Sequence, residues 1–494
     1  MAFGIGGNKG SDPPVVQGVV IGEAVPPPAD GKWGNTEPSG DYVQEDYARE
    51  FNGLKGEHQP KRFHDVFWGI LFVAHLGFMG YLLYETLTNS FANGDDEADI
   101  ADYVELDYSG VAIHTSVCAV SAIGISMVSL GFLMRHAKEL VKMSLFFSVA
   151  MSLAVGVLGL LGGQIYMAVL GFIGAALGAC YAWSIWSRIP FAAANLNTAI
   201  TGVKANTGLA VIAFFYLIVA FVWSVWWIAA AGGSLQYYGG WIVFLFLISF
   251  YWVHQVIQNT VHVTSAGVIG TWWFVPSEAS RCCSPAVKDS FVRATTFSFG
   301  SICLGSLIVA IIQALRALNN MTKEQDECNF LHCIIDCILG CLESIIEYFN
   351  KWAYVYVGLY GYSYIDAGKN VMSLFQNKGW TVLITDSLVE NVLFMMACGI
   401  GLITGLIGYV YAKLDEDVFA GLYIEDAGVP GFLIGLFVGF LMGSVLLSVV
   451  ESAVNTVIVC FAESPGEFQT NHPMLSREMR AAWKEAWPSE CAEM

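Results

Sequence analysis

A carboxylate stands inside the most apolar stretch of the chain and is the group best placed there to do chemistry. Residues 430–461 form a long apolar run that Glu451 and Asn455 interrupt. Helical spacing puts Ser444 and Ser448 on the same face. Because a carboxylate facing lipid costs roughly 2.5 to 3.5 kcal/mol or more, we expect Glu451 to face a cavity, a partner or a transported ion, or to be protonated. The alternative is a position at the membrane interface, since the run exceeds the roughly 20 residues that cross a bilayer.

The helix that must hold Glu451 carries a second pattern, made of glycines. Residues 430–461 are long and apolar enough to cross a hydrocarbon core of about 30 Å, so they predict the last transmembrane helix. Glycine recurs at every fourth residue, at Gly431, Gly435, Gly439 and Gly443. Positions without side chains let another helix approach closely. We therefore expect one face of this helix to pack tightly and the other to be polar.

The composition of the whole chain is that of a polytopic membrane protein. Of its 494 residues 55% are hydrophobic and 13% are charged, whereas soluble domains carry about 25% charged residues. The net charge of −19 argues against a nucleic-acid partner, which needs a basic face, and leaves the lipid bilayer as the expected surroundings. The predicted fold class is an all-α transmembrane bundle.

Hydropathy predicts about ten spans. We expect them at residues 66–86, 110–134, 143–162, 165–186, 208–231, 239–258, 294–316, 352–375, 386–411 and 430–461. Lys and Arg flank alternate loops, which puts both chain ends in the cytoplasm. The membrane side of residues 317–351 is left open, and so is whether residues 352–375 cross.

Three regions follow from this reading. Residues 1–60 are rich in Pro, Gly and acids and predict a disordered cytoplasmic tail. Residues 61–465 are expected to form the transporter domain, and residues 466–494 a short cytoplasmic tail. Within the domain, polar residues and glycines precede Pro276 and predict a helix that is broken near residues 259–275, as in many transporters.

No pattern in the sequence favours an enzyme. It contains no GxxxxGK[ST] stretch for a nucleotide, and no arrangement of His, Cys or Ser that suggests catalysis. Cys333, Cys337 and Cys341 share one helical face, but core packing or acylation explains them better than a metal site. We expect no cofactor and no metal.

Five stretches resemble one family, the choline transporter-like proteins, and in particular its fungal, plant and protist branch. They are SRIPFAAANL (187–196), VHVTSAGVIGTWWF (261–274), FSFGSICLGSLIVAIIQALRAL (297–318), NKWAYVYVGLYGYSYIDAGKNVMSLF (350–375) and SVVESAVNTVIVCFAESP (448–465). The resemblance implies about ten spans, cytoplasmic ends and plasma-membrane transport of choline or a related amine such as ethanolamine. It also implies two aspartates in the last span, where this chain has Glu451 and Asn455.

Choline is a fixed cation, and aromatic faces and carboxylates suit it. Besides Glu451 and Asn455, the residues expected to bind the substrate are Trp183, Trp252, Gln255, Asn259, Trp272 and Trp273. The tryptophans lie close to predicted helix breaks, and an interfacial aromatic belt is the alternative for them. The two amides are expected to orient the hydroxyl end of the substrate or, alternatively, to form hydrogen bonds between helices.

The mechanism expected from these residues is alternating access without a chemical step. Coupling to protons through Glu451 is one option, and entry driven by the membrane potential alone is another. The alternative from a different class is a membrane scaffold or regulator in lipid homeostasis or trafficking. Oligomeric state is left open.

Overall fold

The computed structural model describes residues 61–92, 109–238, 242–323, 329–377, 388–415, 419, 427–486 and 488. All regular secondary structure in these residues is helical, which confirms the predicted fold class. The expected tail of residues 1–60 lies outside the described residues.

The described residues form a series of helices. In chain order they are α2 (Val66–Ala92), α3 (Ser109–Arg135), α4 (Ala137–Leu161), α5 (Ile165–Ile185), the 3-10 turn η3 (Trp186–Arg188), α6 (Ile189–Ala205), α7 (Gly208–Tyr238), α8 (Ile242–Phe274), α9 (Pro285–Thr295), α10 (Phe299–Lys323), α11 (Asn329–Tyr360), α12 (Tyr364–Asn377), α13 (Leu388–Leu414), α14 (Gly428–Glu463), α15 (Pro465–Asn471) and α16 (Pro473–Ala486). In the described part of the chain, nine stretches are long and apolar enough to cross a membrane. They fall in α2, α3, α4, α5 with α6, α7, α8, α10, α13 and α14.

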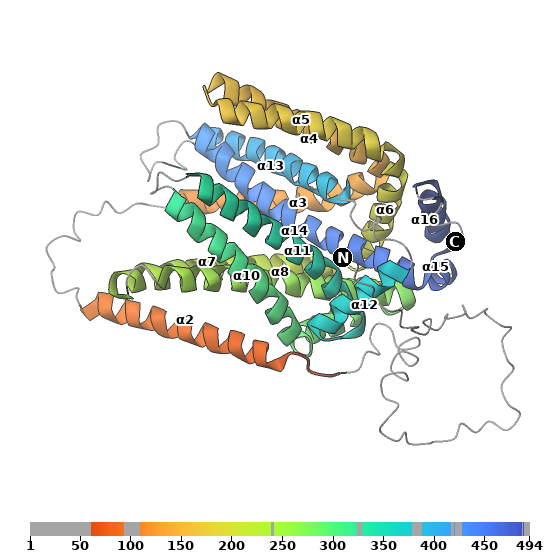
Figure 1. Cartoon of the computed structure of the whole chain (residues 1–494), viewed down its shortest axis with the longest axis horizontal. Helices are drawn as coiled ribbons and strands as arrows, with labels where there is room; N and C mark the ends of the chain where they lie inside the picture. The colour runs from red at the N-terminus through yellow and green to blue at the C-terminus, as the bar shows by residue number, and fades with distance from the viewer. Residues whose placement is uncertain are drawn as a thin grey trace, which may run out of the picture. The chain divides into compact units, whose positions relative to one another are not determined.

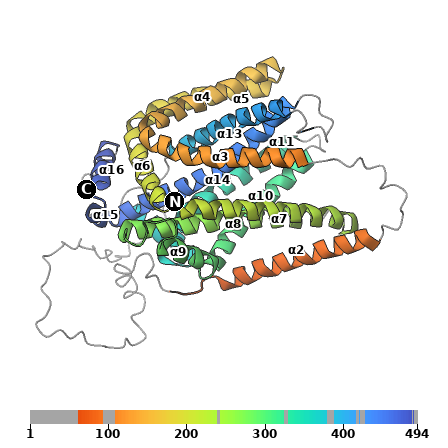
Figure 2. The same cartoon turned by 180° about the vertical axis from the view of Figure 1, so that it is seen from behind.

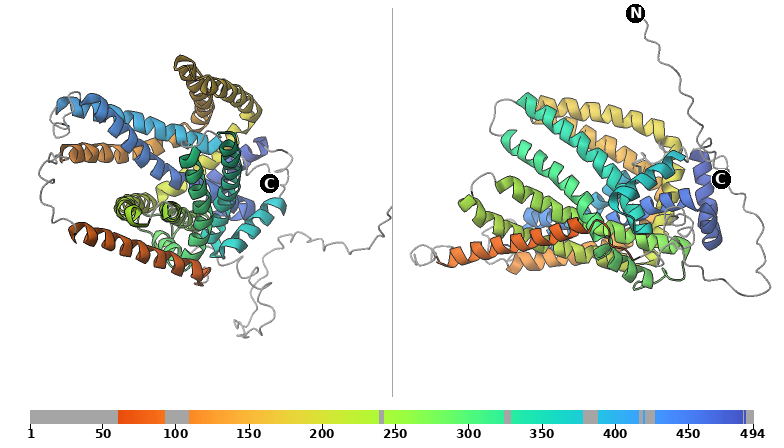
Figure 3. Two further views of the ribbon diagram at one scale, coloured as in Figure 1. Left: turned by 60° about the vertical axis from the view of Figure 1, so that its left-hand side comes forward. Right: turned by 60° about the horizontal axis from the view of Figure 1, so that its bottom comes forward.

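Helix α14, which carries Glu451, is the element around which the others are arranged. It packs against α3, α6, α7, α8, α11, α12 and α13. Helices α13 and α14 lie side by side in Figures 1 and 2 and in the left view of Figure 3, with α3 across them in Figure 2. The α4–α5 hairpin and α2 lie on opposite sides of this group (Figure 1).

The glycines of α14 form the predicted close contact, and the partner is α13. All four are buried, and a Cβ added at Gly435 would lie 2.7 Å from the carbonyl oxygen of Thr404. From the other side, a Cβ added at Gly408 would lie 2.4 Å from the carbonyl oxygen of Gly431. The two backbones therefore meet directly, which confirms the predicted packing face.

The predicted break near residues 259–275 is wrong, because α8 is continuous from Ile242 to Phe274. Its threonines stay helical by bonding back to the preceding turn, as Thr264 does to the Thr260 carbonyl at 2.7 Å. Its glycines serve packing. A Cβ at Gly267 would lie 2.6 Å from the Ser290 hydroxyl oxygen, and one at Gly270 would meet the Leu359 side chain at 2.2 Å.

Residues 352–375, whose crossing the sequence leaves open, do not form one continuous span. The chain turns at Gly361, which has a φ of +66°, so residues 352–360 end α11 and α12 begins at Tyr364. Helix α11 instead begins at Asn329 and runs antiparallel to α10, with contacts from Asn319–His332 at one end to Ile302–Tyr354 at the other. Helix α11 is as long as the candidate membrane spans, although it is not one of the nine that are apolar enough to cross. Hydropathy missed it because it carries Asp336, Glu343, Glu347 and Lys351 among its apolar residues.

The contact between α13 and α14 can be tested by adding a single methyl group. Gly408→Ala should destabilise the protein by about 1 to 3 kcal/mol, because the new Cβ would press on a backbone that cannot move aside without separating the helices. Gly399→Ala is the matched control on α13, since a Cβ there meets nothing within 4 Å. The measurement is the midpoint of thermal unfolding in detergent. Equal midpoints for the two variants would contradict the close contact.

Candidate functional site

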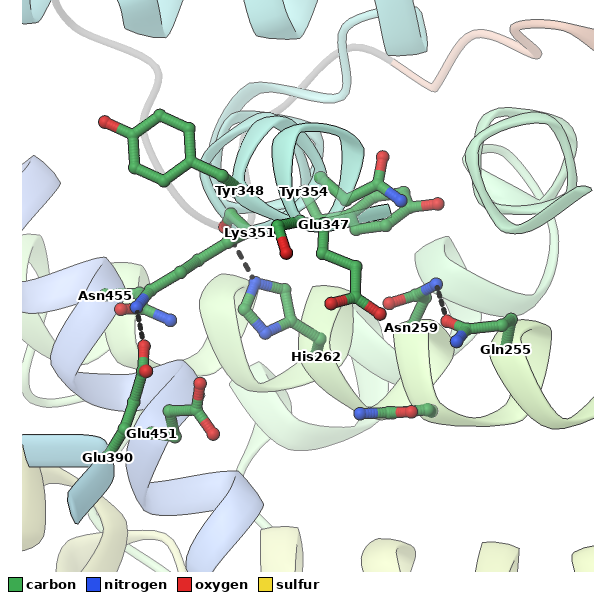
Figure 4. A pocket seen from close by; sticks show the side chains of 13 residues that line it. Gln255, Asn259, His262, Glu347, Tyr348, Lys351, Tyr354, Glu390, Glu451 and Asn455 are labelled. Atoms are coloured by element: carbon green, nitrogen blue, oxygen red, sulfur yellow. Dashed lines mark hydrogen bonds and ion pairs between the residues drawn. The ribbon is translucent and has the colours of Figure 1, made fainter. Parts of the chain in front are cut away.

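A cavity of about 450 Å³ lies between α8, α11, α13 and α14, within the size range of small-molecule sites (Figure 4). It reaches the surface past the exposed side chains of Gln258, Ser344 and Glu347. The full lining is Gln255, Gln258, Asn259 and His262 from α8, Ser344, Glu347, Tyr348, Asn350, Lys351 and Tyr354 from α11, Glu390 from α13, and Glu451 and Asn455 from α14.

The structure brings four of the eight predicted site residues to this cavity. Glu451 and Asn455 reach it from α14, and Gln255 and Asn259 reach it from α8. Glu451 stands three turns before the end of α14, about 18 Å along the helix axis, so it lies within the bundle rather than at the edge of the helix. Its carboxylate has no hydrogen-bond partner among the described residues and points into the cavity (Figure 4).

Three carboxylates and one ammonium group give the cavity a formal charge of −2 when all are ionised and His262 is neutral. The acids are Glu347, Glu390 and Glu451, and the cation is Lys351. Lys351 forms an ion pair with Glu390, which joins α11 to α13. This pairing leaves Glu347 and Glu451 as the acids whose charge a ligand in the cavity would meet. The site therefore favours a cation.

His262 holds three of the cavity helices together. Its Nε2 lies 3.2 Å from the backbone carbonyl of Lys351 on α11, and its Nδ1 lies 2.7 Å from the Ser452 hydroxyl on α14. Because a carbonyl oxygen can only accept, the hydrogen of the first contact belongs to Nε2. The ring thus fixes the spacing between α8, α11 and α14 at the level of the cavity.

A row of polar side chains leads away from the cavity along α8, α10 and α11. The amide of Asn259 donates to the Ser306 hydroxyl at 2.9 Å and lies 3.4 Å from the Gln255 oxygen. Gln255 donates to Gln313 at 3.3 Å, and Gln313 donates to Glu343 at 3.0 Å. The predicted hydrogen bonds between helices are therefore present, and Gln255 and Asn259 also line the cavity, while their role toward a substrate stays a prediction.

The structure places the four predicted tryptophans outside the cavity. Trp183 is 86% exposed on α5, on the surface that lipid would cover. Trp252 packs edge-on against Phe72 and donates to the Cys303 carbonyl at 3.0 Å. Trp272 and Trp273 are buried against the C-terminal segment, stacked on His472 and Phe468 respectively. The aromatic rings in the cavity are those of Tyr348 and Tyr354 instead.

Sequence reasoning did not select Glu347, Lys351, His262 and Glu390 as site residues, although one signal for α11 was present. Glu343, Glu347 and Lys351 recur every fourth residue, which puts them on one face of a helix. If residues 343–351 are taken as part of one continuous amphipathic helix, these three side chains form a charged stripe that faces the neighbouring helices. In the described part of the chain, no three His, Cys, Asp or Glu side chains are grouped as a metal site.

Beyond the cavity, at the end of α14, a layer of buried aromatic rings closes the bundle. Trp273 stacks on Phe468 with ring centroids 3.8 Å apart, and Trp483 of α16 lies 4.5 Å from Phe461. Trp483 also contacts Phe191 of α6 at 4.9 Å. The predicted tail of residues 466–494 therefore contains most of α15 and all of α16, which pack at one end of the bundle, on the right in Figure 1.

Known proteins are similar in sequence to this chain over most of its length. The model of plasma-membrane choline transporters matches residues 169–466, more than half of the chain and the range that holds every cavity-lining residue. The protein PNS1 of Mycosarcoma maydis is 30% identical over 473 residues, which cover 89% of this chain and 87% of that protein. The chain belongs to the choline transporter-like family.

Other relatives of this family are found in fungi and in a slime mould. A CTL-like protein of Dictyostelium discoideum is 28% identical over 437 residues, which cover 86% of this chain and 76% of that protein. The protein PNS1 of Cryptococcus neoformans is 28% identical over 497 residues, covering 91% and 88% of the two chains. Membership of the family makes this chain a multi-pass membrane transporter.

The docking of the C-terminal segment in this family member should weaken in acid. Burial lowers the pKa of His472 below its usual 6.5, although its bond to the Trp272 carbonyl opposes that shift. A lowered pKa means that the folded state holds the neutral ring, so stability is lost as the pH falls below about 6.5. The thermal unfolding midpoint should therefore fall from pH 7.5 to pH 5.5 by more in the wild type than in His472→Gln. An equal fall in both would contradict this role of His472.

Proposed function

We propose that this transporter carries choline or a closely related amine cation such as ethanolamine across the plasma membrane by alternating access, through the cavity between α8, α11, α13 and α14. The observation that carries the proposal is the Glu451 carboxylate, which faces the cavity while the ammonium of Lys351 is paired with Glu390. Its family relationship supports the same substrate class.

The charge of the cavity offsets the cost of taking a fixed cation out of water. A quaternary ammonium cannot lose its charge by deprotonation, so the site must supply compensating contacts. A carboxylate about 5 Å from the cation contributes about 3 kcal/mol at an effective dielectric constant of 20. Glu451 provides one such carboxylate and Glu347 a second.

Tyr348 and Tyr354 supply the aromatic faces that a quaternary ammonium prefers. Each well-placed ring contributes about 0.5 to 2 kcal/mol. Both tyrosines stand on α11, six residues apart, so they sit on the same helix as Glu347 and Lys351. The proposed binding group is therefore a carboxylate pair with two phenol rings.

The aromatic layer at the end of α14 supports alternating access. We take the side of the cavity toward the end of α14, where these rings pack, as closed, while another side reaches the surface past Ser344 and Glu347. In a transporter with cytoplasmic ends, as the loop charges predict, the closed side is the cytoplasmic one. A membrane potential of 100 mV, negative inside, favours cation entry by about 2.3 kcal/mol. Proton exchange at Glu451 is the second way to drive the cycle.

Removing the charge of Glu451 should reduce transport. Glu451→Gln in proteoliposomes should take up labelled choline at least about tenfold more slowly than the wild type under an imposed potential, because a loss of about 1.4 kcal/mol already gives that factor. Glu478→Gln is the control, since this acid is exposed on α16 and lies outside the cavity. Uptake by the wild type across an imposed pH gradient, with the potential clamped, tests proton exchange.

Two outcomes would overturn parts of the proposal. Uptake by Glu451→Gln at the wild-type rate would remove this carboxylate from the site while leaving transport in place. If neither choline nor ethanolamine enters wild-type vesicles above the empty-vesicle background, the proposed substrate class is lost. The scaffold or regulator considered from the sequence would then be the better explanation.

A further inference from the structure

The main cavity continues into a second, much smaller hollow. Its free volume is about 20 Å³, enough for one group the size of a water molecule. Lys351, Glu390, Glu451 and Asn455 line both hollows, so the two are neighbours. The further walls of the small hollow are Phe191, Ala192, Asn195, Trp352, Leu388, Val389, Val454 and Ile458.

Asn195 brings an unpaired amide donor to this small hollow. The residue is 1% exposed on α6, which Pro190 starts in its first turn. The indole N–H of Trp483 donates to Asn195 Oδ1 at 2.8 Å. Because an indole can only donate, this contact fixes which end of the amide is oxygen and leaves the NH₂ group on the other side. That Nδ2 is buried and has no hydrogen-bond partner.

Trp352 brings a second donor to the same place. The residue is 1% exposed on α11, and its Nε1 is buried without a hydrogen-bond partner. The Tyr348 hydroxyl lies close to the indole N–H, but this contact does not have the geometry of a hydrogen bond. The position of the ring is held by Phe375, whose ring centroid lies 5.0 Å away, and by the Lys351 ammonium over its face.

Two buried donors around a hollow for one small group call for an acceptor atom. Leaving a buried N–H unpaired is costly, and an oxygen with two lone pairs can accept from both donors. An ammonium group has no lone pair to offer. A carboxylate is disfavoured because Glu390 and Glu451 line the same hollow. The oxygen of a neutral hydroxyl group meets these conditions.

We propose that Asn195 and Trp352 recognise the hydroxyl oxygen of an amino alcohol, while its ammonium group lies in the main cavity beside Glu451. This inference rests on the proposed function, because it assigns the two ends of the transported cation to two adjoining hollows. It makes Asn195 and Trp352 specificity-determining residues. The transporter then selects 2-hydroxyethyl amines and discriminates against ammonium cations that have an alkyl group in place of the hydroxyl.

The test uses choline and propyltrimethylammonium, a cation of nearly the same shape with a methyl group in place of the hydroxyl. Both unlabelled compounds compete against labelled choline for uptake by the full-length protein in proteoliposomes. In the wild type, choline should compete at least about tenfold more strongly than propyltrimethylammonium. The latter has no hydroxyl oxygen, so it leaves the two buried donors unpaired. Trp352→Phe removes one donor and should lower this ratio about three- to tenfold by weakening choline alone.

Trp223→Phe is the matched control. Trp223 also has a buried indole N–H without a partner and is 4% exposed, but it lines neither hollow. This variant should keep the wild-type ratio.

Each outcome decides a separate question. If the two compounds compete equally in the wild type, or if Trp352→Phe keeps the wild-type ratio while choline is still transported, the small hollow holds a bound water only and the inference is overturned. This result leaves the proposed function standing. If neither labelled choline nor labelled ethanolamine enters wild-type vesicles, the proposed function fails as well. Should Trp352→Phe fail to fold, the wild-type ratio still decides.

Discussion

Charged groups inside a helix bundle need partners, since surroundings of low polarity penalise an isolated charge by several kcal/mol. This requirement shapes the centre of the protein. Helix α11 brings a stripe of charged residues against α8 and α10, and Arg316 pairs with two of them, Asp336 and Glu343. Glu390 pairs with a third, Lys351. Glu347 and Glu451, which line the cavity, take no part in these ion pairs, and the proposed cation would be compensated there.

Helix α14 connects this polar centre to the most closely packed part of the bundle. Its first half meets α13 backbone to backbone, and its second half carries Glu451 and Asn455 to the cavity. Because Glu390 lies on α13, its ion pair with Lys351 joins α11 to the closely packed pair of helices α13 and α14. The close α13–α14 contact and the unbroken α8 favour movements of whole helices over local unwinding.

Two patterns carried by α14 were predicted correctly. The four-residue glycine repeat in residues 430–461 identified a packing face, and the interruption at Glu451 identified the polar face opposite. The break predicted in α8 and the failure to predict α11 have one cause. Hydropathy takes polar residues as loops or breaks, but those of α8 and α11 stay helical, since they bond to their own preceding turn or to neighbouring helices. The tryptophans were predicted as site residues because of their chemistry. The direction in which each ring points depends on the rotation of its helix about its own axis, and packing against other helices sets that rotation.

By itself, the sequence determined that the chain is a helical membrane protein and where most of its helices lie. The reason is that a sufficiently long apolar run must form all its backbone hydrogen bonds within itself in lipid, which makes it a helix, and this depends on local sequence alone. Tertiary structure decided which polar groups meet. Lys351 and Glu390 are 39 residues apart in the chain, and Asn195 and Trp483 are 288 apart. Contacts at such separations follow from how the helices pack, because only packing sets the rotation and depth at which each side chain faces its partner.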